Sequence, residues 1–294
     1  MSAPKEPQIR VLICTDASVV ANPLKLALLG NASITVQKEV ADTISAITAV
    51  RNGDIDIVLL DIGIGEKPVR TAITRLKRAD PSVNIVMLGT LSFANVRTSI
   101  RGLMDGAVEY LPTPTPHAAG ADQRTFEESL ERVLRALGRR KTKRVPPTPP
   151  VKTTPEISKV APKILLIGSS TGGPQAVTDL LTGLGNDFNL PILITQHMPA
   201  SFTSIFAKSL SQHLKRNVKE GSEAHHLQPG DILIAPGGLH MQVKAHGQST
   251  RVHLFDGPQI NYCKPSVDPM FESAVAIYGA AILAVVLTGV MQRI

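Results

Sequence analysis

One serine lies in a glycine-bracketed turn of a kind that can present a nucleophile. Gly168 to Gly172 read GSSTG, which matches the pattern G-x-S-x-G around Ser170. The pattern follows an apolar run predicted to be a strand and precedes a predicted helix, as a nucleophile turn requires. Free N–H groups at the helix start would stabilise an oxyanion. On the motif alone, a phosphate-binding loop and a purely structural turn remain as alternatives.

A nucleophilic serine needs a base, and the chain contains eight histidines. His197 follows the apolar run PILITQ, so we expect it at the same sheet edge as Ser170. His225 and His226 lie in a polar stretch and are predicted to be solvated loop residues. His240 follows a Gly-rich turn and is predicted to be structural, with a place in the site as the alternative.

Two carboxylates near the N-terminus come at the ends of predicted strands. Asp16 follows the run VLIC, and Asp61 ends the run IVLLD. Either residue alone could simply cap a helix. Because the carboxyl ends of parallel strands share one edge, the pair could hold Mg²⁺, and one carboxylate could accept a phosphoryl group.

Strand-like and helix-like periodicities alternate through the first 140 residues, which predicts a doubly wound parallel sheet. The expected strands are 9–14, 34–36, 55–60, 83–88 and 108–111, and the expected helices are 18–29, 41–52, 67–78, 93–104 and 122–140.

A second α/β pattern begins after a proline-rich stretch at about 145–162, so we expect two such domains. The predicted organisation is a receiver-like domain at 1–120, a basic helix and linker at 121–162, and a catalytic domain at 163–294. Within the last domain, strands are expected at 163–167, 191–195, 231–235, 241–245, 251–255 and 281–287, and helices at 174–184, 202–214 and 267–278.

The net charge of +7 is concentrated in the middle of the chain, where residues 121–163 hold 11 basic and 5 acidic side chains. This distribution indicates a solvated helix end and tether, and we predict no nucleic-acid partner. Only two cysteines are present, without metal-like spacing, and no apolar run is long enough for a bilayer span. We therefore expect a cytoplasmic protein without membrane insertion.

The N-terminal motifs VLICTDAS, DIDIVLLDIGI, NIVMLGT and DGAVEYLPTP resemble those of two-component receiver domains. The resemblance implies that Asp61 is the phosphoacceptor, that Asp16 and Asp61 bind Mg²⁺, and that a histidine kinase is the phosphodonor. Three positions depart from the family pattern. Thr15 replaces a second acid, Gly89 stands at the usual Ser or Thr position with Thr90 one place later, and Thr113 replaces a lysine. Because of Thr15 and Thr113, we expect weak or absent phosphorylation.

The later segments IGSSTGGPQA, QHMPASFTSIFA, LQPGDILIAPGGLHM, KPSVDPMFESA and AVVLTG resemble the catalytic domain of chemotaxis protein-glutamate methylesterases. With the receiver, this resemblance covers nearly the whole chain. It implies hydrolysis of glutamate methyl esters, and deamidation of glutamines, on the cytoplasmic helices of methylated chemoreceptors. Ser170 then matches the nucleophile and His197 the base, and catalysis needs no cofactor.

The end of the chain departs from the same family. The family's catalytic Asp lies in a T-G-M-G-x-D-G motif, and here the matching position is Arg293, one residue before the last. From this we expect a chain truncated at its C-terminus, with poor esterase activity and with apolar surface exposed on the strand at 281–287. The alternative is a non-catalytic regulatory or binding relative of the family.

Overall fold

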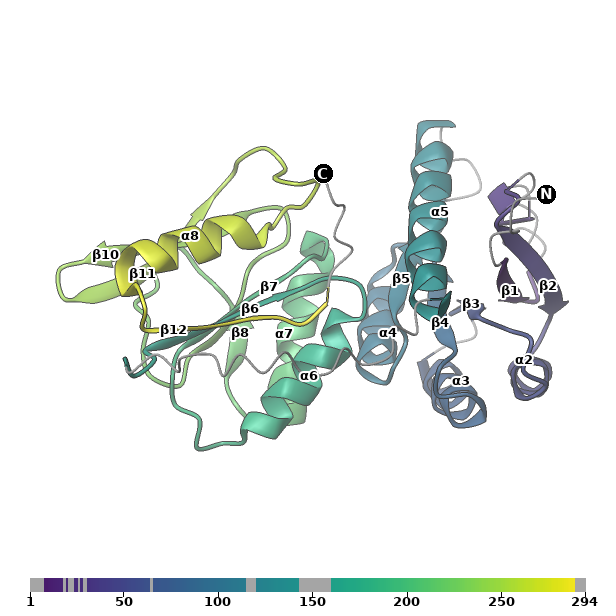
Figure 1. The fold of residues 1–294 in the computed structure, drawn as a ribbon, viewed down its shortest axis with the longest axis horizontal. Coiled ribbons are helices and arrows are strands. Elements are labelled where there is room, and N and C mark those ends of the chain that lie inside the picture. Colours follow the sequence, from purple (N-terminus) through teal and green to yellow (C-terminus); the bar gives the residue numbers. More distant parts are fainter. Residues whose placement is uncertain are drawn as a thin grey trace, which may run out of the picture. The chain divides into compact units, whose positions relative to one another are not determined.

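The computed structural model describes residues 8–17, 20, 24, 25, 27, 28, 31–63, 66–114, 120–142 and 160–288 of the chain. The chain divides into two compact units, residues 1–151 and residues 152–294 (Figure 1). Each unit contains a five-stranded sheet whose neighbouring strands all run parallel, and helices pack against both sheets. The predicted fold class, two parallel-sheet α/β domains, is confirmed.

The sheet of the first unit has the strand order β2-β1-β3-β4-β5. Its strands are β1 (Ile9–Cys14), β2 (Ile34–Val40), β3 (Ile57–Asp61), β4 (Asn84–Gly89) and β5 (Glu109–Pro112), and its helices are α2 (Thr43–Arg51), α3 (Glu66–Ala79), α4 (Phe93–Met104) and α5 (Gly120–Thr142). The chain runs outward from β1 to β2 and then returns to β3. The strand order therefore reverses between β1 and β3, which is where sheets of this class place functional groups.

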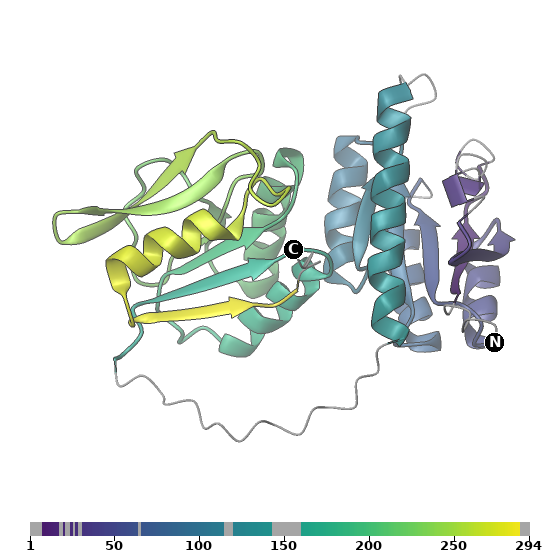
Figure 2. The ribbon, with the colours of Figure 1, turned by 45° about the horizontal axis from the view of Figure 1, so that its top comes forward.

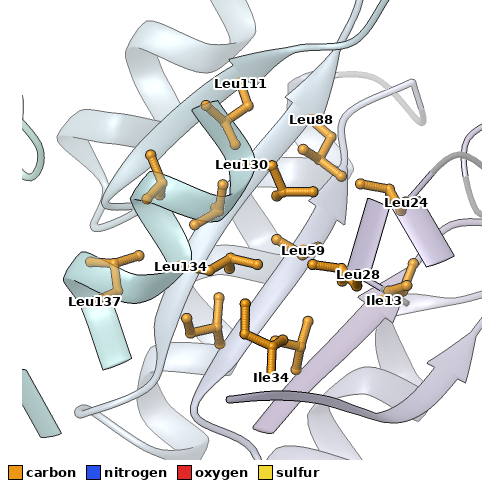
Figure 3. Packing of buried hydrophobic residues seen from close by; sticks show 14 of the residues in the cluster. Ile13, Leu24, Leu28, Ile34, Leu59, Leu88, Leu111, Leu130, Leu134 and Leu137 are labelled. Atoms are coloured by element: carbon orange, nitrogen blue, oxygen red, sulfur yellow. The ribbon is translucent and has the colours of Figure 1, made fainter. Parts of the chain in front are cut away.

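Alternate side chains of these strands fill two different layers. Val11 and Ile13 of β1 join Leu59 of β3 and Leu88 of β4 in the core cluster that also contains the apolar face of α5 (Figure 3). The intervening residues point to the opposite face of the sheet. From α5 the cluster takes Phe126, Leu130, Val133, Leu134 and Leu137, whose spacing of three or four residues places them on one side of the helix.

The sheet of the second unit has the order β12-β6-β7-β9-β8. Its strands are β6 (Ile164–Ser169), β7 (Ile192–Gln196), β8 (Val218–Glu220), β9 (Ile232–Ile234) and β12 (Ile282–Val286), and β10 (His240–His246) and β11 (Ser249–Phe255) form a separate antiparallel hairpin. The helices are α6 (Gly173–Leu184), α7 (Ala200–Leu214) and α8 (Val267–Tyr278). Here the strand order reverses at β6, between β12 and β7.

Helix α8 and the hairpin cover one face of this sheet, and α6 and α7 cover the other (Figure 2). Met270 and Ala274 of α8 share a buried cluster with Leu166 of β6, Leu193 of β7 and Met241 of β10. The sheet is thereby held between two layers, and the carboxyl ends of β6, β7 and β12 come to a common edge.

The structure differs from the expected elements in two respects. It contains β8, a three-residue strand too short to show a periodicity, and it places β10 and β11 outside the parallel sheet. Of the helix expected at 18–29, only residues 20, 24, 25, 27 and 28 are described, and these are helical. Residues 143–159, which include most of the proline-rich stretch expected at about 145–162, lie outside the described residues.

The described residues allow two of the expectations to be checked, the exposed apolar surface on the strand at 281–287 and the absence of a membrane-spanning helix. Strand β12 lies at the sheet edge, where Leu283 is 41% exposed and Val286 is 66% exposed, so the expected exposure of apolar side chains on this strand is confirmed. None of the helices in the described ranges is both long and apolar enough to cross a membrane.

Candidate active site

The turn between β6 and α6 presents Ser170 at the carboxyl edge of the second sheet. Ser169 is buried as the last residue of β6, and Ser170 is half-buried directly after it. Gly172 adopts a left-handed conformation with φ of 77°, which lets the chain reverse tightly before α6 begins at Gly173. The Gly173 N–H donates a 2.7 Å hydrogen bond to the Ser170 carbonyl oxygen. The serine therefore lies beside the positive end of a helix, as the motif predicted.

His197 follows the neighbouring strand at the same level of the sheet. The parallel register pairs Ser169 with Gln196, and the His197 N–H donates a 3.0 Å hydrogen bond to the Ser169 carbonyl oxygen. The side chain of His197 is exposed at this edge. The expectation that Ser170 and His197 share one edge is confirmed by this register, and their chemical roles stay predictions.

Gln196 connects the two strand ends through its buried side chain, which is 2% exposed. Its Oε1 accepts a 2.6 Å hydrogen bond from the Ser169 hydroxyl. Its Nε2 donates to the carbonyl oxygens of Ser170, at 3.0 Å, and of His197, at 3.2 Å. Gln196 was not among the residues expected in the site, although an amide at the end of the mostly apolar run PILITQ is a signal for a buried polar contact.

Thr288 links a third strand end to the serine turn. Its Oγ1 accepts a 3.0 Å hydrogen bond from the Ser170 N–H, and the preceding Leu287 N–H donates to the Gly168 carbonyl oxygen at 3.0 Å. Leu287 and Thr288, which follow β12, therefore brace the turn from the side opposite to β7. Residues 289–294, including Arg293, lie outside the described residues, so the expectations for that position are not tested.

The other histidines considered from the sequence have structural partners. His240 is fully buried, with Nε2 donating to the Pro258 carbonyl oxygen at 2.9 Å and Nδ1 accepting from the Ser266 N–H at 3.1 Å. Both ring nitrogens are thus engaged in a neutral imidazole, which agrees with the predicted structural role. His225 differs from the predicted solvated state because it is half-buried and contacts Asp231, with 2.7 Å between Nε2 and Oδ2.

His226 remains exposed, as predicted, and accepts a 2.7 Å hydrogen bond from Arg251 Nε. Partial loss of hydration, followed by the nearby Arg251 charge, lowers the pKa of His226. Neither this histidine nor His225 belongs to a group of three or more potential metal ligands in the part of the chain that is described.

In the first unit, Asp61 is engaged by two donors from its own chain. Thr15 Oγ1 donates to Asp61 Oδ2 at 2.8 Å, and the Gly63 N–H donates to Oδ1 at 2.9 Å. Asp16 follows on the same edge with its side chain exposed. Within the described ranges, no group of three or more acidic, histidine or cysteine side chains is arranged to hold a metal ion. Magnesium binding by Asp16 and Asp61 therefore stays a prediction.

Thr113 and Tyr110, which belong to one of the receiver-like motifs, bond to the end of β4 at the same edge of the first sheet. The Thr113 N–H donates to the Gly89 carbonyl oxygen at 2.9 Å. The Tyr110 hydroxyl donates to the carbonyl oxygens of Gly89, at 2.7 Å, and of Thr90, at 3.0 Å. Burial, and then the Asp61 charge, raises the pKa of Tyr110. The tyrosine therefore stays neutral and fixes the end of β4.

Taken together, these features define a two-unit α/β protein with a receiver-like first sheet and a nucleophile-type serine turn on the second sheet. Residues 165–292 match the family model described as CheB methylesterase. A protein-glutamate methylesterase/protein-glutamine glutaminase from Bradyrhizobium diazoefficiens is 34% identical over 96% of this chain and 79% of its own length. A protein of the same name from Azospirillum brasilense is 35% identical over 97% of this chain and 78% of its own length.

The chain belongs to the protein-glutamate methylesterase/protein-glutamine glutaminase family. The resemblance stated from the motifs is thereby confirmed. Among solved structures, the Thermotoga maritima CheB methylesterase catalytic domain is 37% identical, with 45% of this chain and 70% of that chain covered and a TM-score of 0.43. The relatives carry the names of enzymes, so the non-catalytic alternative gains no support from them.

Proposed function

We propose that this chain hydrolyses γ-glutamyl methyl esters, and deamidates glutamines, on the cytoplasmic helices of chemoreceptors by a serine acyl-enzyme route. The observation that carries the proposal is the shared edge of Ser170 and His197, which follow paired strands at one level. Family membership supplies the substrate class. The relatives named above are called methylesterases and glutaminases, and Ser170 and His197 lie in the segments of this chain that resemble the family's motifs.

The proposed reaction has two steps. Ser170 Oγ attacks the ester carbonyl carbon while His197 accepts the hydroxyl proton, and the proton then leaves with methoxide as methanol. Water next attacks the acyl-enzyme, with His197 again as base, and the proton taken from water passes from His197 to Ser170 Oγ as the glutamate carboxylate is released. For a glutamine side chain, ammonia leaves in place of methanol. The N–H groups at the start of α6 stabilise the oxyanion in both steps. No cofactor takes part.

We propose that the first unit regulates this reaction, with a histidine kinase as phosphodonor and Asp61 as acceptor. Transfer is expected to be weak, because Thr15 and Thr113 stand where the receiver pattern has an acid and a lysine. Asp16 and Asp61 are the residues that would hold Mg²⁺.

The test is methanol release from methylated receptor membranes, with Ser170→Ala and Ser169→Ala as a matched pair. Ser170→Ala should abolish release and labelling by a fluorophosphonate probe, because it removes the nucleophile. Ser169→Ala should keep labelling at Ser170. Equal activity of Ser170→Ala and the unsubstituted chain would refute the assignment, as would loss of labelling in Ser169→Ala alone.

The rate is expected to be low, because Arg293 occupies the position that matches the family's catalytic Asp. Removal of such an Asp from a serine triad costs roughly 10⁴-fold in turnover. A cation near His197 would also disfavour the imidazolium that forms during proton transfer. Arg293→Asp should therefore raise methanol release. An unchanged or reduced rate in Arg293→Asp would show that position 293 does not act on His197.

A further inference from the structure

Gln196 makes its three side-chain hydrogen bonds to the two segments that carry the proposed catalytic residues. The acceptor Oε1 receives the Ser169 hydroxyl at 2.6 Å, and the donor Nε2 reaches the carbonyl oxygens of Ser170 and His197. The side chain is 2% exposed, so water does not compete for these bonds. Gln196 is thus a direct bridge between the ends of β6 and β7.

The orientation of the Gln196 amide follows from its partners. Nε2 lies between two carbonyl oxygens, which can only accept, so the nitrogen must be the atom that faces them. Oε1 then faces the Ser169 hydroxyl. A glutamate at position 196 would keep the acceptor for Ser169 and lose both donors, placing a carboxylate against two carbonyl oxygens.

Gly173 holds the Gln196 amide from the other side. A Cβ atom built on Gly173 would lie 2.0 Å from Gln196 Oε1, 3.0 Å from its Cδ and 2.9 Å from Ser169 Cβ. The distances to Oε1 and to Ser169 Cβ are shorter than a real Cβ atom can approach, so the first residue of α6 must be glycine for the amide to occupy its position. The amide is therefore confined by packing as well as by hydrogen bonds.

We propose that Gln196 is a positioning residue that sets the placement of Ser170 relative to His197. This inference rests on the proposed function for its catalytic consequence. A shift of about 1 Å between reacting groups can cost about 100-fold in rate. Because the hydrogen bonds from Gln196 to Ser170 and His197 go to their backbone carbonyl oxygens, its loss should reduce kcat and leave KM almost unchanged.

The experiment compares Gln196→Met, Gln196→Glu and Gly173→Ala with the control Gly183→Ala. Gly183 lies in the same helix as Gly173, and a Cβ there meets nothing within 4 Å. We expect kcat for methanol release, and the rate of fluorophosphonate labelling, to fall about 10- to 100-fold in the first three variants. The control should retain both values. Equal and measurable rates in Gln196→Met and the control would overturn the proposal.

A double variant separates positioning from fold stability. Gln196→Met leaves the Ser169 hydroxyl unpaired, and adding Ser169→Ala removes that buried group. The double variant should therefore regain thermal stability while its kcat per folded molecule stays low. Recovery of the rate together with stability would show that Gln196 only stabilises the fold, and the proposal would fail.

Amide hydrogen exchange decides the inference even if no esterase activity is found. The His197 N–H and the Ser170 N–H are both hydrogen-bonded at the bridged edge, to Ser169 O and Thr288 Oγ1. In Gln196→Met, local opening at this edge no longer requires breaking the Gln196 hydrogen bonds, so its free energy is lower. Both amides should therefore exchange at least about 10-fold faster. The Ala235 N–H, bonded to Ile194 O within the sheet, should be unaffected. Unchanged exchange at His197 and Ser170 would contradict the bridge itself, whereas absent activity with faster exchange would contradict only the proposed function.

Discussion

The hydroxyl of Thr15 donates a 2.8 Å hydrogen bond to Oδ2 of Asp61 across the ends of β1 and β3. The other carboxylate oxygen of Asp61 accepts from the Gly63 N–H, and Thr15 Oγ1 itself accepts from the Ala17 N–H at 3.1 Å. Asp61 is therefore satisfied by neutral donors of its own chain at the point where the strand order reverses.

This bond leads to a prediction for phosphorylation. Acetyl phosphate with Mg²⁺ should add little mass to the chain, because a neutral hydroxyl stands where a second magnesium-binding carboxylate is expected. Thr15→Asp should increase the phosphorylated fraction, and Asp61→Asn should remove that gain. Mass spectrometry of the intact protein measures all three. Rapid and stable phosphorylation of the unsubstituted chain at Asp61 would show that the Thr15 contact is no obstacle.

Gly237 packs against the start of α7, a few residues after His197, and has no room for a larger side chain. A Cβ there would lie 2.4 Å from the Ala200 nitrogen and 2.4 Å from the Pro199 carbonyl carbon, so the start of α7 would have to move. We expect Gly237→Ala to lower the free energy of unfolding by about 1–3 kcal/mol. Gly183→Ala should instead be neutral or raise it by roughly 0.5–1 kcal/mol, because alanine favours helix. Urea titration measures both, and equal stabilities would contradict the prediction.

We expect protonation of Glu223 to destabilise the second unit at acid pH. Its carboxylate accepts hydrogen bonds from the Leu254 N–H at 2.6 Å and from His253 Nδ1 at 3.1 Å. The Leu254 bond, followed by the His253 bond, lowers the pKa of Glu223 below its ordinary value of 4.5. The carboxylate therefore stabilises the fold above about pH 4.5, and this contribution is lost as the pH falls through the lowered pKa.

Glu223→Gln should accordingly flatten the decline of the unfolding free energy below pH 5. The same substitution at Glu272, an exposed carboxylate on α8, is the matched control. Thermal unfolding followed between about pH 3 and pH 7 compares the slopes with the linkage relation. A Glu223→Gln profile that coincides with the unsubstituted chain would rule out this source of acid sensitivity.

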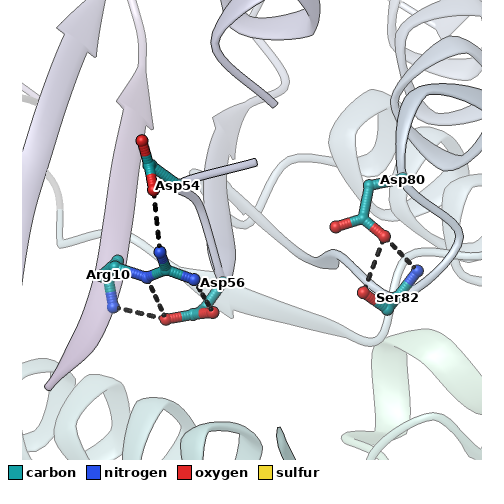
Figure 4. A network of polar contacts seen from close by, with 5 residues as sticks. All are labelled: Arg10, Asp54, Asp56, Asp80 and Ser82. Atoms are coloured by element: carbon teal, nitrogen blue, oxygen red, sulfur yellow. Dashed lines mark hydrogen bonds and ion pairs between the residues drawn. The ribbon is translucent and has the colours of Figure 1, made fainter. Parts of the chain in front are cut away.

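The Arg10 guanidinium contacts two carboxylates, the buried Asp56 and the exposed Asp54 (Figure 4). We expect the two contacts to contribute differently to stability. Asp56 accepts from Arg10 Nε at 3.1 Å, from Nη2 at 3.0 Å and from its backbone N–H at 2.9 Å. Asp54 accepts only from Nη1, at 3.1 Å, and its side chain is 78% exposed. Asp56→Ala should cost about 1–3 kcal/mol of stability because it leaves these donors without their carboxylate.

Asp54→Ala should cost less than about 1 kcal/mol, as is usual for an exposed ion pair. Denaturant titration of the two variants under one set of conditions gives the comparison. An equal or larger loss in Asp54→Ala would mean that burial does not set the strength of these contacts.

Periodicity predicted β1, α4 and α8 to the residue, and it predicted most other elements with ends shifted by one to four residues. These predictions succeeded because the buried face of a strand or helix must be apolar, so the spacing of apolar residues in the local sequence reveals the element. β8 was missed because three residues carry no measurable period, and the separation of β10 and β11 from the parallel sheet was missed because pairing partners are not local information.

The sequence by itself determined that Ser170 occupies a tight turn before a helix and that Asp61 ends a strand, because glycine spacing and strand periodicity are local properties. Only the tertiary structure decided which groups these residues meet. Gln196 reaches the serine turn from β7, Thr288 reaches it from β12, and Thr15 reaches Asp61 from β1. Each contact joins residues 26 to 118 positions apart, and each exists because strand order and register bring those positions to one sheet edge. Strand order and register are properties of the assembled sheet, and no local pattern encodes them.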